Sequence, residues 1–114
     1  MIRGDIYQAD LDPTEGSEQA GKRPIIIVSR NGINRSSPVV VIVPLTKYSS
    51  RKKIYPSHHL IKASAENGLS MDSIAKCEQI RAISKSRLLS QLGKVNTQDK
   101  EKIDRALKIV LSLS

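Results

Sequence analysis

The stretch Pro24-Ile-Ile-Ile-Val28 is a continuous apolar run, and Val39-Val-Val-Ile-Val43 repeats the same pattern a short distance along the chain. Such runs predict strands that are buried on both faces, because an apolar side chain at every position leaves no polar face for water. Asn31-Gly32 and the segment 34–38 supply turn residues between them, and Pro44 is expected to end the second run. The core should therefore be built mainly from these two central strands.

Shorter strands are expected on both sides of this pair. Alternating or β-branched residues occur at Asp5–Ala9, His59–Lys62, Ser70–Cys77 and Gln79–Ile83. The connections between these segments are too short for crossover helices, so we expect most of the sheet to be antiparallel.

Helical patterns are confined to the C-terminal third. Ser86–Leu92 predicts a short helix that stops at Gly93, and Asn96 or Thr97 can cap a second helix. The apolar stripe of that second helix consists of Ile103, Leu107, Val110 and Leu111. Short strands with a terminal helix predict the α+β class, as a small antiparallel β-barrel with short helices and a C-terminal helix.

The length of 114 residues predicts one domain, residues 1–114, with a core of its own. Cys77 is the only cysteine, so we expect it to be core packing in a reducing compartment. The N-terminal residues lack the apolar region of a signal peptide, and no stretch approaches the ~18 apolar residues of a membrane span. We therefore expect a cytoplasmic protein that does not contact membranes.

Charge is distributed unevenly along this basic chain, whose formal net charge is +8. Residues 1–20 hold five acids against one arginine, whereas residues 21–65 hold nine bases and no acid. A solvated surface normally mixes both signs, so this separation favours an anion-binding face.

Seven short blocks resemble, in order and spacing, the MazF/PemK/Kid family of toxins, and they span nearly the whole chain. The blocks are Arg3-Gly-Asp-Ile-Tyr7, Ala9-Asp-Leu-Asp-Pro13, Gly16-Ser-Glu-Gln19, Gly21-Lys-Arg-Pro24, Asn34-Arg-Ser-Ser-Pro38, Val43-Pro-Leu-Thr46 and Glu78-Gln-Ile-Arg81. The chain departs from many relatives at Gln8, where they place Trp, and in its unusually basic run Arg51-Lys-Lys53.

The resemblance implies the toxin of a type II toxin–antitoxin system, with an SH3-like barrel, a homodimeric assembly and a cognate MazE-like antitoxin as partner. It also implies sequence-specific cleavage of single-stranded RNA, such as mRNA, that leaves a 2′,3′-cyclic phosphate and a 5′-hydroxyl. Attack by the RNA's own 2′-hydroxyl needs a proton acceptor, a proton donor and positive charge at the phosphate, but no metal. We expect no metal or other cofactor, because the sequence holds neither an HExxH motif nor a carboxylate cluster of the two-metal type.

The resemblance assigns the catalytic positions to Arg23 and Thr46. A guanidinium at position 23 can hold two phosphate oxygens, and the hydroxyl at position 46 can donate to the phosphoryl oxygen as charge develops. Some relatives are thought to use a carboxylate and a cation at the positions of Glu78 and Lys76 for acid–base chemistry. The alternatives are an ordinary solvated arginine, a hydroxyl that caps a strand end, and a Glu78 that binds Arg81 or caps a turn.

Binding candidates surround these positions. The loop 14–22 offers donors, the basic segment 47–53 offers charge for phosphates, and its two flanking tyrosines offer rings for unstacked bases. The expected RNA-binding residues are Ser17, Gln19, Lys22, Lys47, Tyr48, Arg51, Lys52, Lys53, Tyr55, His58, Lys76 and Gln79. The basic segment could instead be a solvated lysine loop, and His58 could be a structural residue at a strand end.

Two other function classes compete with catalysis. One is a CcdB-like gyrase poison on the same fold, which grips a protein through a C-terminal Trp-Gly-Ile, whereas this chain ends in Leu111-Ser-Leu-Ser114 and contains no Trp. The other is a nucleic-acid-binding protein that uses only the basic segment. Arg23 and Thr46 in their family contexts favour catalysis over both.

Overall fold

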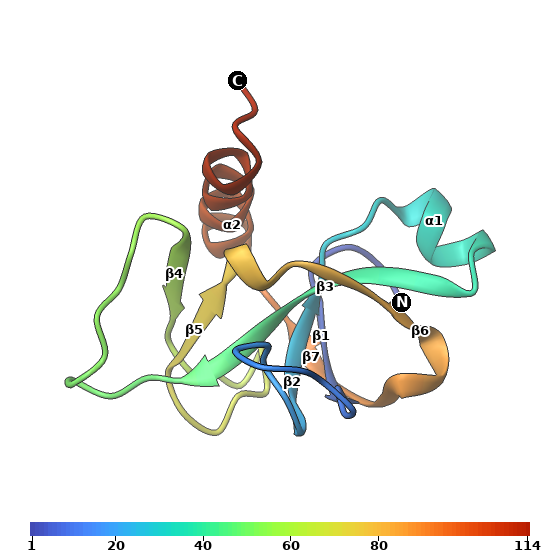
Figure 1. Ribbon diagram of the computed structural model, residues 1–114, viewed down its shortest axis with the longest axis horizontal. Helices are drawn as coiled ribbons and strands as arrows, with labels where there is room; N and C mark the ends of the chain where they lie inside the picture. The colour runs from blue at the N-terminus through green and yellow to red at the C-terminus, as the bar shows by residue number, and fades with distance from the viewer.

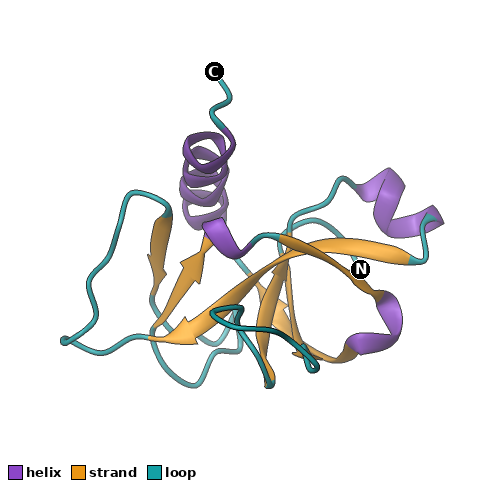
Figure 2. Ribbon diagram, in the orientation of Figure 1, coloured by secondary structure: helices purple, strands orange, loops and turns teal.

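The computed structural model describes residues 1–114 as a strongly curved sheet with one long helix packed against it (Figure 1). The strands are β1 (Asp5–Asp10), β2 (Lys22–Ile27), β3 (Val39–Lys47), β4 (His58–Ile61), β5 (Ser73–Lys76), β6 (Arg81–Ser84) and β7 (Leu88–Lys94). The helices are α1 (Asn31–Ser36) and α2 (Thr97–Leu111), with single 3₁₀ turns η1 (Cys77–Gln79) and η2 (Lys85–Arg87). Figure 2 separates these helices from the strands and loops, and the α+β prediction is confirmed. No helix combines the length and apolar character that crossing a membrane requires.

The seven strands form one antiparallel sheet, as expected. Their hydrogen-bonded order is β4-β5-β3-β2-β1-β7, and β6 pairs with β3 outside this path. Backbone pairing does not close the sheet into a ring, because the terminal strands β4 and β7 are not hydrogen-bonded to each other. The segment after β4 lies against β7 instead, where Lys94 N donates to Glu66 O at 3.1 Å.

Strand β3 does not end at Pro44 as predicted but continues to Lys47. Val28 N donates to Val41 O, so the odd-numbered residues of β3 direct their backbone groups toward β2. Pro44 therefore directs its nitrogen to the opposite edge, where the partner of β3 changes from β6 (up to Ile42) to β5 (from Leu45). The missing N–H of Pro44 costs no hydrogen bond between strands, because Pro44 lies between the part of β3 that pairs with β6 and the part that pairs with β5.

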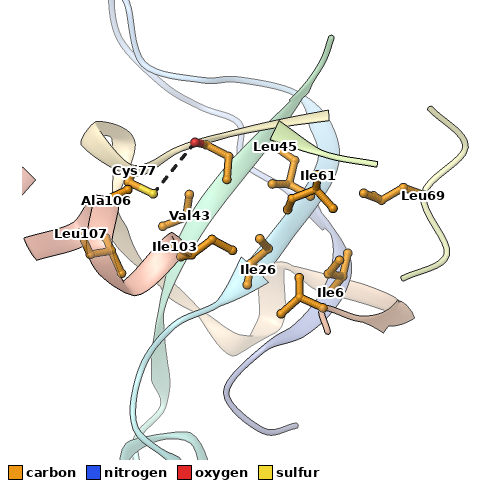
Figure 3. Close-up of a cluster of buried hydrophobic side chains, with 12 residues drawn as sticks. Ile6, Ile26, Val43, Leu45, Ile61, Leu69, Cys77, Ile103, Ala106 and Leu107 are labelled. Atoms are coloured by element: carbon orange, nitrogen blue, oxygen red, sulfur yellow. Dashed lines mark hydrogen bonds between the residues drawn. The ribbon is translucent and has the colours of Figure 1, made fainter. Parts of the chain in front are cut away.

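The two central strands bury both of their faces, which confirms the prediction from the apolar runs. Ile26 and Val43 belong to a cluster on the α2 side of the sheet, drawn in Figure 3, where Ile103 and Leu107 of the helix cover it. Ile25, Ile27, Val40 and Ile42 face the opposite side and form a second cluster with Ala9, Leu11 and Ile83. Cys77 lies in the first cluster, fully buried.

One helix prediction is right and one is wrong. Asn96 caps α2, accepting from Asp99 N at 2.7 Å, although Leu111 of its predicted stripe is exposed. The segment expected as a helix from Ser86 forms η2 and then β7, because three leucines in one short window fit either structure and pairing with β1 decides.

The turn residues expected at 31–32 and 34–36 form helix α1, and Ser37 and Pro38 connect it to β3. Asn34 is buried there, and its side-chain Nδ2 donates to Ser29 O at 2.8 Å. That side-chain bond, which the sequence pattern did not signal, fixes the helical turn against the end of β2.

Candidate functional site

Arg23 and Thr46 lie on neighbouring strands and point to the same face of the sheet. The β2–β3 register runs through Ile27↔Ile42 and Ile25↔Pro44, so its continuation by two residues places Arg23 opposite Thr46. Side chains two residues apart on a strand share a face, which here is the face of the second core cluster. The two residues that the resemblance singled out are thus brought together by strand pairing.

The guanidinium of Arg23 is held at two of its nitrogens by backbone carbonyls. Nε donates to Ala20 O at 2.8 Å, and Nη1 donates to Leu45 O at 3.2 Å. These bonds fix the plane of the group and leave Nη2 for a ligand. Arg23 is half-buried and is therefore not the freely solvated arginine of the alternative interpretation.

Thr46 is contacted by the basic segment that follows β3. Lys52 Nζ donates to Thr46 Oγ1 at 3.2 Å and to Lys47 O at 2.6 Å. One lysine of the segment therefore folds back onto the strand end and brings its charge to the Thr46 hydroxyl. Arg51 and Lys53 stay exposed further along the segment.

A cavity of about 530 Å³ borders these residues at the ends of β2 and β3. Strand alternation directs Lys22, Pro24, Leu45 and Lys47 to the face opposite Arg23, so the cavity opens mainly on that other face. The cavity extends around the strand ends, and no carboxylate lines it. The residues that line it are Gln8, Lys22, Arg23, Pro24, Leu45, Thr46, Lys47, Gly68, Leu69, Ser70, Met71, Ser73 and Leu92. Cations on both faces therefore surround the ends of β2 and β3.

The loop between β1 and β2 crosses the Arg23 face, in front of β2 and β3 in Figure 1. Gln79 of η1 holds its middle: Gln19 N donates to Gln79 Oε1 at 3.4 Å, and Gln79 Nε2 donates to Ser17 O at 3.3 Å. Ser17, Gln19 and Gln79 thus lie together, although none of them lines the cavity.

Glu78 and His58 form a pair outside the cavity. Glu78 Oε2 lies 3.0 Å from His58 Nε2, and His58 Nδ1 accepts from Tyr55 N at 3.3 Å, which assigns the proton to Nε2. Burial acts to raise the pKa of Glu78, but hydrogen bonds from His58, its own backbone and Ser57, with the charge of His58, lower it below its ordinary value. Glu78 therefore does not bind Arg81, whose Nη1 is buried without a hydrogen-bond partner.

The aromatic candidates are arranged around His58. The ring of Tyr55 meets that of His58 edge-on, with centroids 5.3 Å apart, and Lys53 Nζ lies 5.8 Å from the centre of the Tyr55 ring. Tyr55 is 52% exposed and presents ring surface to solvent, whereas Tyr48 is half-buried. Lys76 is paired with His58 across the β4–β5 ladder, so these residues form a second group at the other end of β5.

The segment 68–73 contributes Ser70, Met71 and Ser73 to the cavity, and none of these residues was predicted from the sequence as a site residue. Nothing in its composition signals a site, because it contains neither a cation nor a recognisable motif. The packing of Gly68 against Leu92 and the pairing of Ser73 with Lys47 bring it to the strand ends. No group of three or more His, Cys, Asp or Glu side chains is placed to hold a metal ion.

Comparison with known proteins adds a family to this geometry. The chain is 40% identical to the endoribonuclease MazF9 of Mycobacterium tuberculosis over 99% of this chain and 98% of that protein. It is 39% identical to the endoribonuclease EndoA of Bacillus subtilis over 97% of this chain and 94% of the relative. A solved mycobacterial endoribonuclease in complex with its cognate antitoxin superposes with a TM-score of 0.81 at 28% identity, covering 100% of this chain and 97% of the other.

The family described as PemK-like, MazF-like toxin of type II toxin–antitoxin system matches residues 2–111. The match includes Arg23, Thr46 and Glu78 together with the loop over the Arg23 face. This chain belongs to the PemK-like, MazF-like family of toxins of type II toxin–antitoxin systems.

Proposed function

We propose that this chain is an endoribonuclease that cleaves single-stranded RNA sequence-specifically by attack of the 2′-hydroxyl on the adjacent phosphate. The observation that carries the proposal is the placement of the Arg23 guanidinium and the Thr46 hydroxyl on one face of two paired strands, with Lys52 Nζ 3.2 Å from that hydroxyl. The endoribonuclease relatives at about 40% identity support it.

In the proposed reaction the 2′-oxygen forms a bond to phosphorus and loses its proton, while the bond from phosphorus to the 5′-oxygen breaks and that oxygen gains a proton. The products are a 2′,3′-cyclic phosphate and a 5′-hydroxyl. A guanidinium stays protonated in proteins, so Arg23 is suited to stabilise the crowded phosphate and not to abstract a proton. Its fixed plane favours this role, because a donor that is already oriented costs no reorganisation in the transition state.

Glu78 is the proposed proton acceptor among the three catalytic candidates. Its pKa lies below the ordinary value, so it is ionised at neutral pH. This role requires the scissile phosphate to lie within reach of Glu78 as well as of Arg23 and Thr46, although Glu78 does not line the cavity. A Glu78→Gln variant that lowers kcat alone would support proton transfer, whereas a rise in KM alone would assign Glu78 to RNA binding.

RNA binding is proposed for the cations around the strand ends and for the group around Tyr55. Phosphates would contact Lys22, Lys47 and Lys52, and an unstacked base would lie on the exposed ring of Tyr55. A homodimer and a MazE-like antitoxin are proposed from the family alone, and the solved mycobacterial relative with its cognate antitoxin supports the second of these partners.

The test is digestion of a long defined RNA, followed by sequencing of the fragment ends and identification of their terminal groups. We expect cyclic phosphate and 5′-hydroxyl ends at one short motif. An Arg23→Ala variant should keep the fold but cleave roughly 10²-fold more slowly, as expected for loss of one oriented donor, whereas Lys108→Ala on the exposed face of α2 should cleave normally. Intact RNA after incubation with the folded protein would refute the proposal and favour a toxin that only binds.

Metal independence is tested in the same assay. We expect cleavage to persist in EDTA, because the charge that a metal would supply to the phosphate is provided by Arg23 and the neighbouring lysines. Loss of cleavage in chelator, with recovery on addition of a divalent cation, would contradict this part of the proposal.

A further inference from the structure

The peptide group between Ala20 and Gly21 connects the side chains of Asp12 and Arg23. Its carbonyl, Ala20 O, accepts from Arg23 Nε at 2.8 Å, and its N–H, on Gly21, donates to Asp12 Oδ1 at 2.9 Å. Because the carbonyl and the N–H of one trans peptide lie in one rigid plane and point in opposite directions, the two bonds fix the same plane from its two sides. Asp12 and Arg23 are thus linked although they do not touch.

Asp12 is itself fixed in place. Arg87 Nη1 donates to the backbone oxygen of Asp12 and to Asp10 O, and Asp12 N donates to Asp10 Oδ1 at 3.1 Å. Leu11 N also donates to Gly21 O at 3.0 Å, which extends the β1–β2 ladder to the base of the loop. The carboxylate that meets the Gly21 N–H therefore projects from an anchored backbone.

Without that carboxylate the Ala20–Gly21 peptide has an alternative orientation. Gly21 has φ +78°, in the region that glycine enters and leaves without a steric penalty, and its Cα has open space around it. A rotation of the peptide plane would replace the carbonyl beside Arg23 with an N–H, which cannot accept a hydrogen bond. Arg23 would then keep only its bond to Leu45 O and would lose its fixed plane.

We propose that Asp12 is a positioning residue that orients the Arg23 guanidinium through the Ala20–Gly21 peptide. The role rests on the proposed function, since it affects cleavage only if Arg23 acts on the phosphate. The contact of Asp12 with this peptide is a single hydrogen bond from the Gly21 N–H to Oδ1. Its role therefore requires an acceptor oxygen at this position and not a negative charge. The competing interpretation is that Asp12 only stabilises the loop, in which case its loss would lower the stability of the fold and leave the chemical step unchanged.

Three variants separate these roles by kinetics on an RNA that the protein cleaves. We expect Asp12→Ala to lower kcat about tenfold with little change in KM, the scale of losing one hydrogen bond that a charged group receives in the transition state. Asp12→Asn should retain kcat within about twofold, because an amide oxygen can accept the same N–H. In an Arg23→Ala background, Asp12→Ala should have no further effect, because the side chain that it orients is gone.

A spectroscopic readout tests the same coupling without reference to activity. In a ¹⁵N-labelled protein, exchange of the Arg23 Nε proton with solvent should be slow in the wild type and in Asp12→Asn, and several-fold faster in Asp12→Ala. Glu18→Ala is the matched control, since Glu18 is another loop carboxylate that accepts a backbone N–H, from Glu15 at 2.9 Å, without contacting the Ala20–Gly21 peptide. The control should exchange like the wild type.

Several results would overturn the inference. They are an unchanged Arg23 signal and kcat in a folded Asp12→Ala, an Asp12→Asn as impaired as Asp12→Ala, or a full additional loss in the Arg23→Ala background. A wild type that leaves RNA intact would instead refute the proposed function, and the exchange measurement would still decide whether Asp12 holds Arg23.

Discussion

At the scale of single residues, Arg23 is placed by Ala20, three residues before it, and by residues of β3 that only the fold brings near. Strand pairing sets its position opposite Thr46, and the loop that precedes it supplies the carbonyl that orients it. A donor held in this way is worth more at a developing charge than a flexible one, because no reorganisation is needed when the charge appears. The same geometry explains why a guanidinium that is only half-buried can be well defined.

The Glu78–His58 pair gives a prediction on pH and stability. Because the pKa of Glu78 is lowered in the fold, ionised Glu78 stabilises the protein above the pKa of the unfolded chain, and this contribution is lost as pH falls through the folded-state pKa. The pair is half exposed on the Glu78 side, with 42% of that side chain accessible, so we expect Glu78→Gln to cost only roughly 0.2–1 kcal/mol at neutral pH.

Urea denaturation of the wild type and of Glu78→Gln at a series of pH values measures this effect. The difference in unfolding free energy should shrink to zero in acid, where Glu78 is protonated in both states. A difference that is constant across the pH range would show that the carboxylate charge contributes nothing.

At the scale of elements, β7 passes so close to the segment after β4 that position 93 has no room for a side chain. A Cβ on Gly93 would lie 2.2 Å from Glu66 O and 2.7 Å from Asn67 O. The glycine that the sequence suggested as a helix stop is therefore required for contact between two chain segments. This contact fills the gap between the strands β4 and β7, which do not pair.

Gly93→Ala should destabilise the fold by about 1–3 kcal/mol, because the backbone of β7 or of residues 66–67 has to shift. Gly32→Ala in α1 is the control, since the nearest atom to its added Cβ is a flexible arginine nitrogen at 3.9 Å and alanine favours a helix. Thermal and urea denaturation of both variants decide the matter. Equal stability of Gly93→Ala and the wild type would contradict the close approach.

At the scale of the whole molecule, the chain carries a net charge of +8, and three of its cations, Lys22, Arg23 and Lys47, lie around the ends of β2 and β3. If three of Lys22, Arg23, Lys47 and Lys52 contact phosphates, the logarithm of the affinity for a non-cleavable RNA should fall with the logarithm of salt concentration at a slope near roughly −2. Lys52→Gln should make the slope shallower by about 0.7, and Lys108→Gln should leave it unchanged. Fluorescence titrations at several salt concentrations give these slopes. A slope near zero in the wild type would assign these lysines to solubility.

The strands and the last helix were predictable because their signals are local. The apolar runs 24–28 and 39–43 have no polar face to present to water, so all of their residues except Val39 are buried or half-buried, and Asn96 caps α2 through a neighbour three residues away. The β7 segment carried no such local signal, and Pro44 was misjudged because its cost depends on which strand lies beside it.

The sequence by itself determined the residue types that a phosphate requires, the two buried strands that carry them and the family to which the chain belongs. Tertiary structure alone decided that Arg23 faces Thr46, that Glu78 is paired with His58, and that the Ala20–Gly21 peptide lies between Asp12 and Arg23. The physical reason is that the sequence signals for a buried strand and for a helix cap lie within a few consecutive residues. Register, pairing and the orientation of a peptide plane depend on partners that only the folded chain brings together.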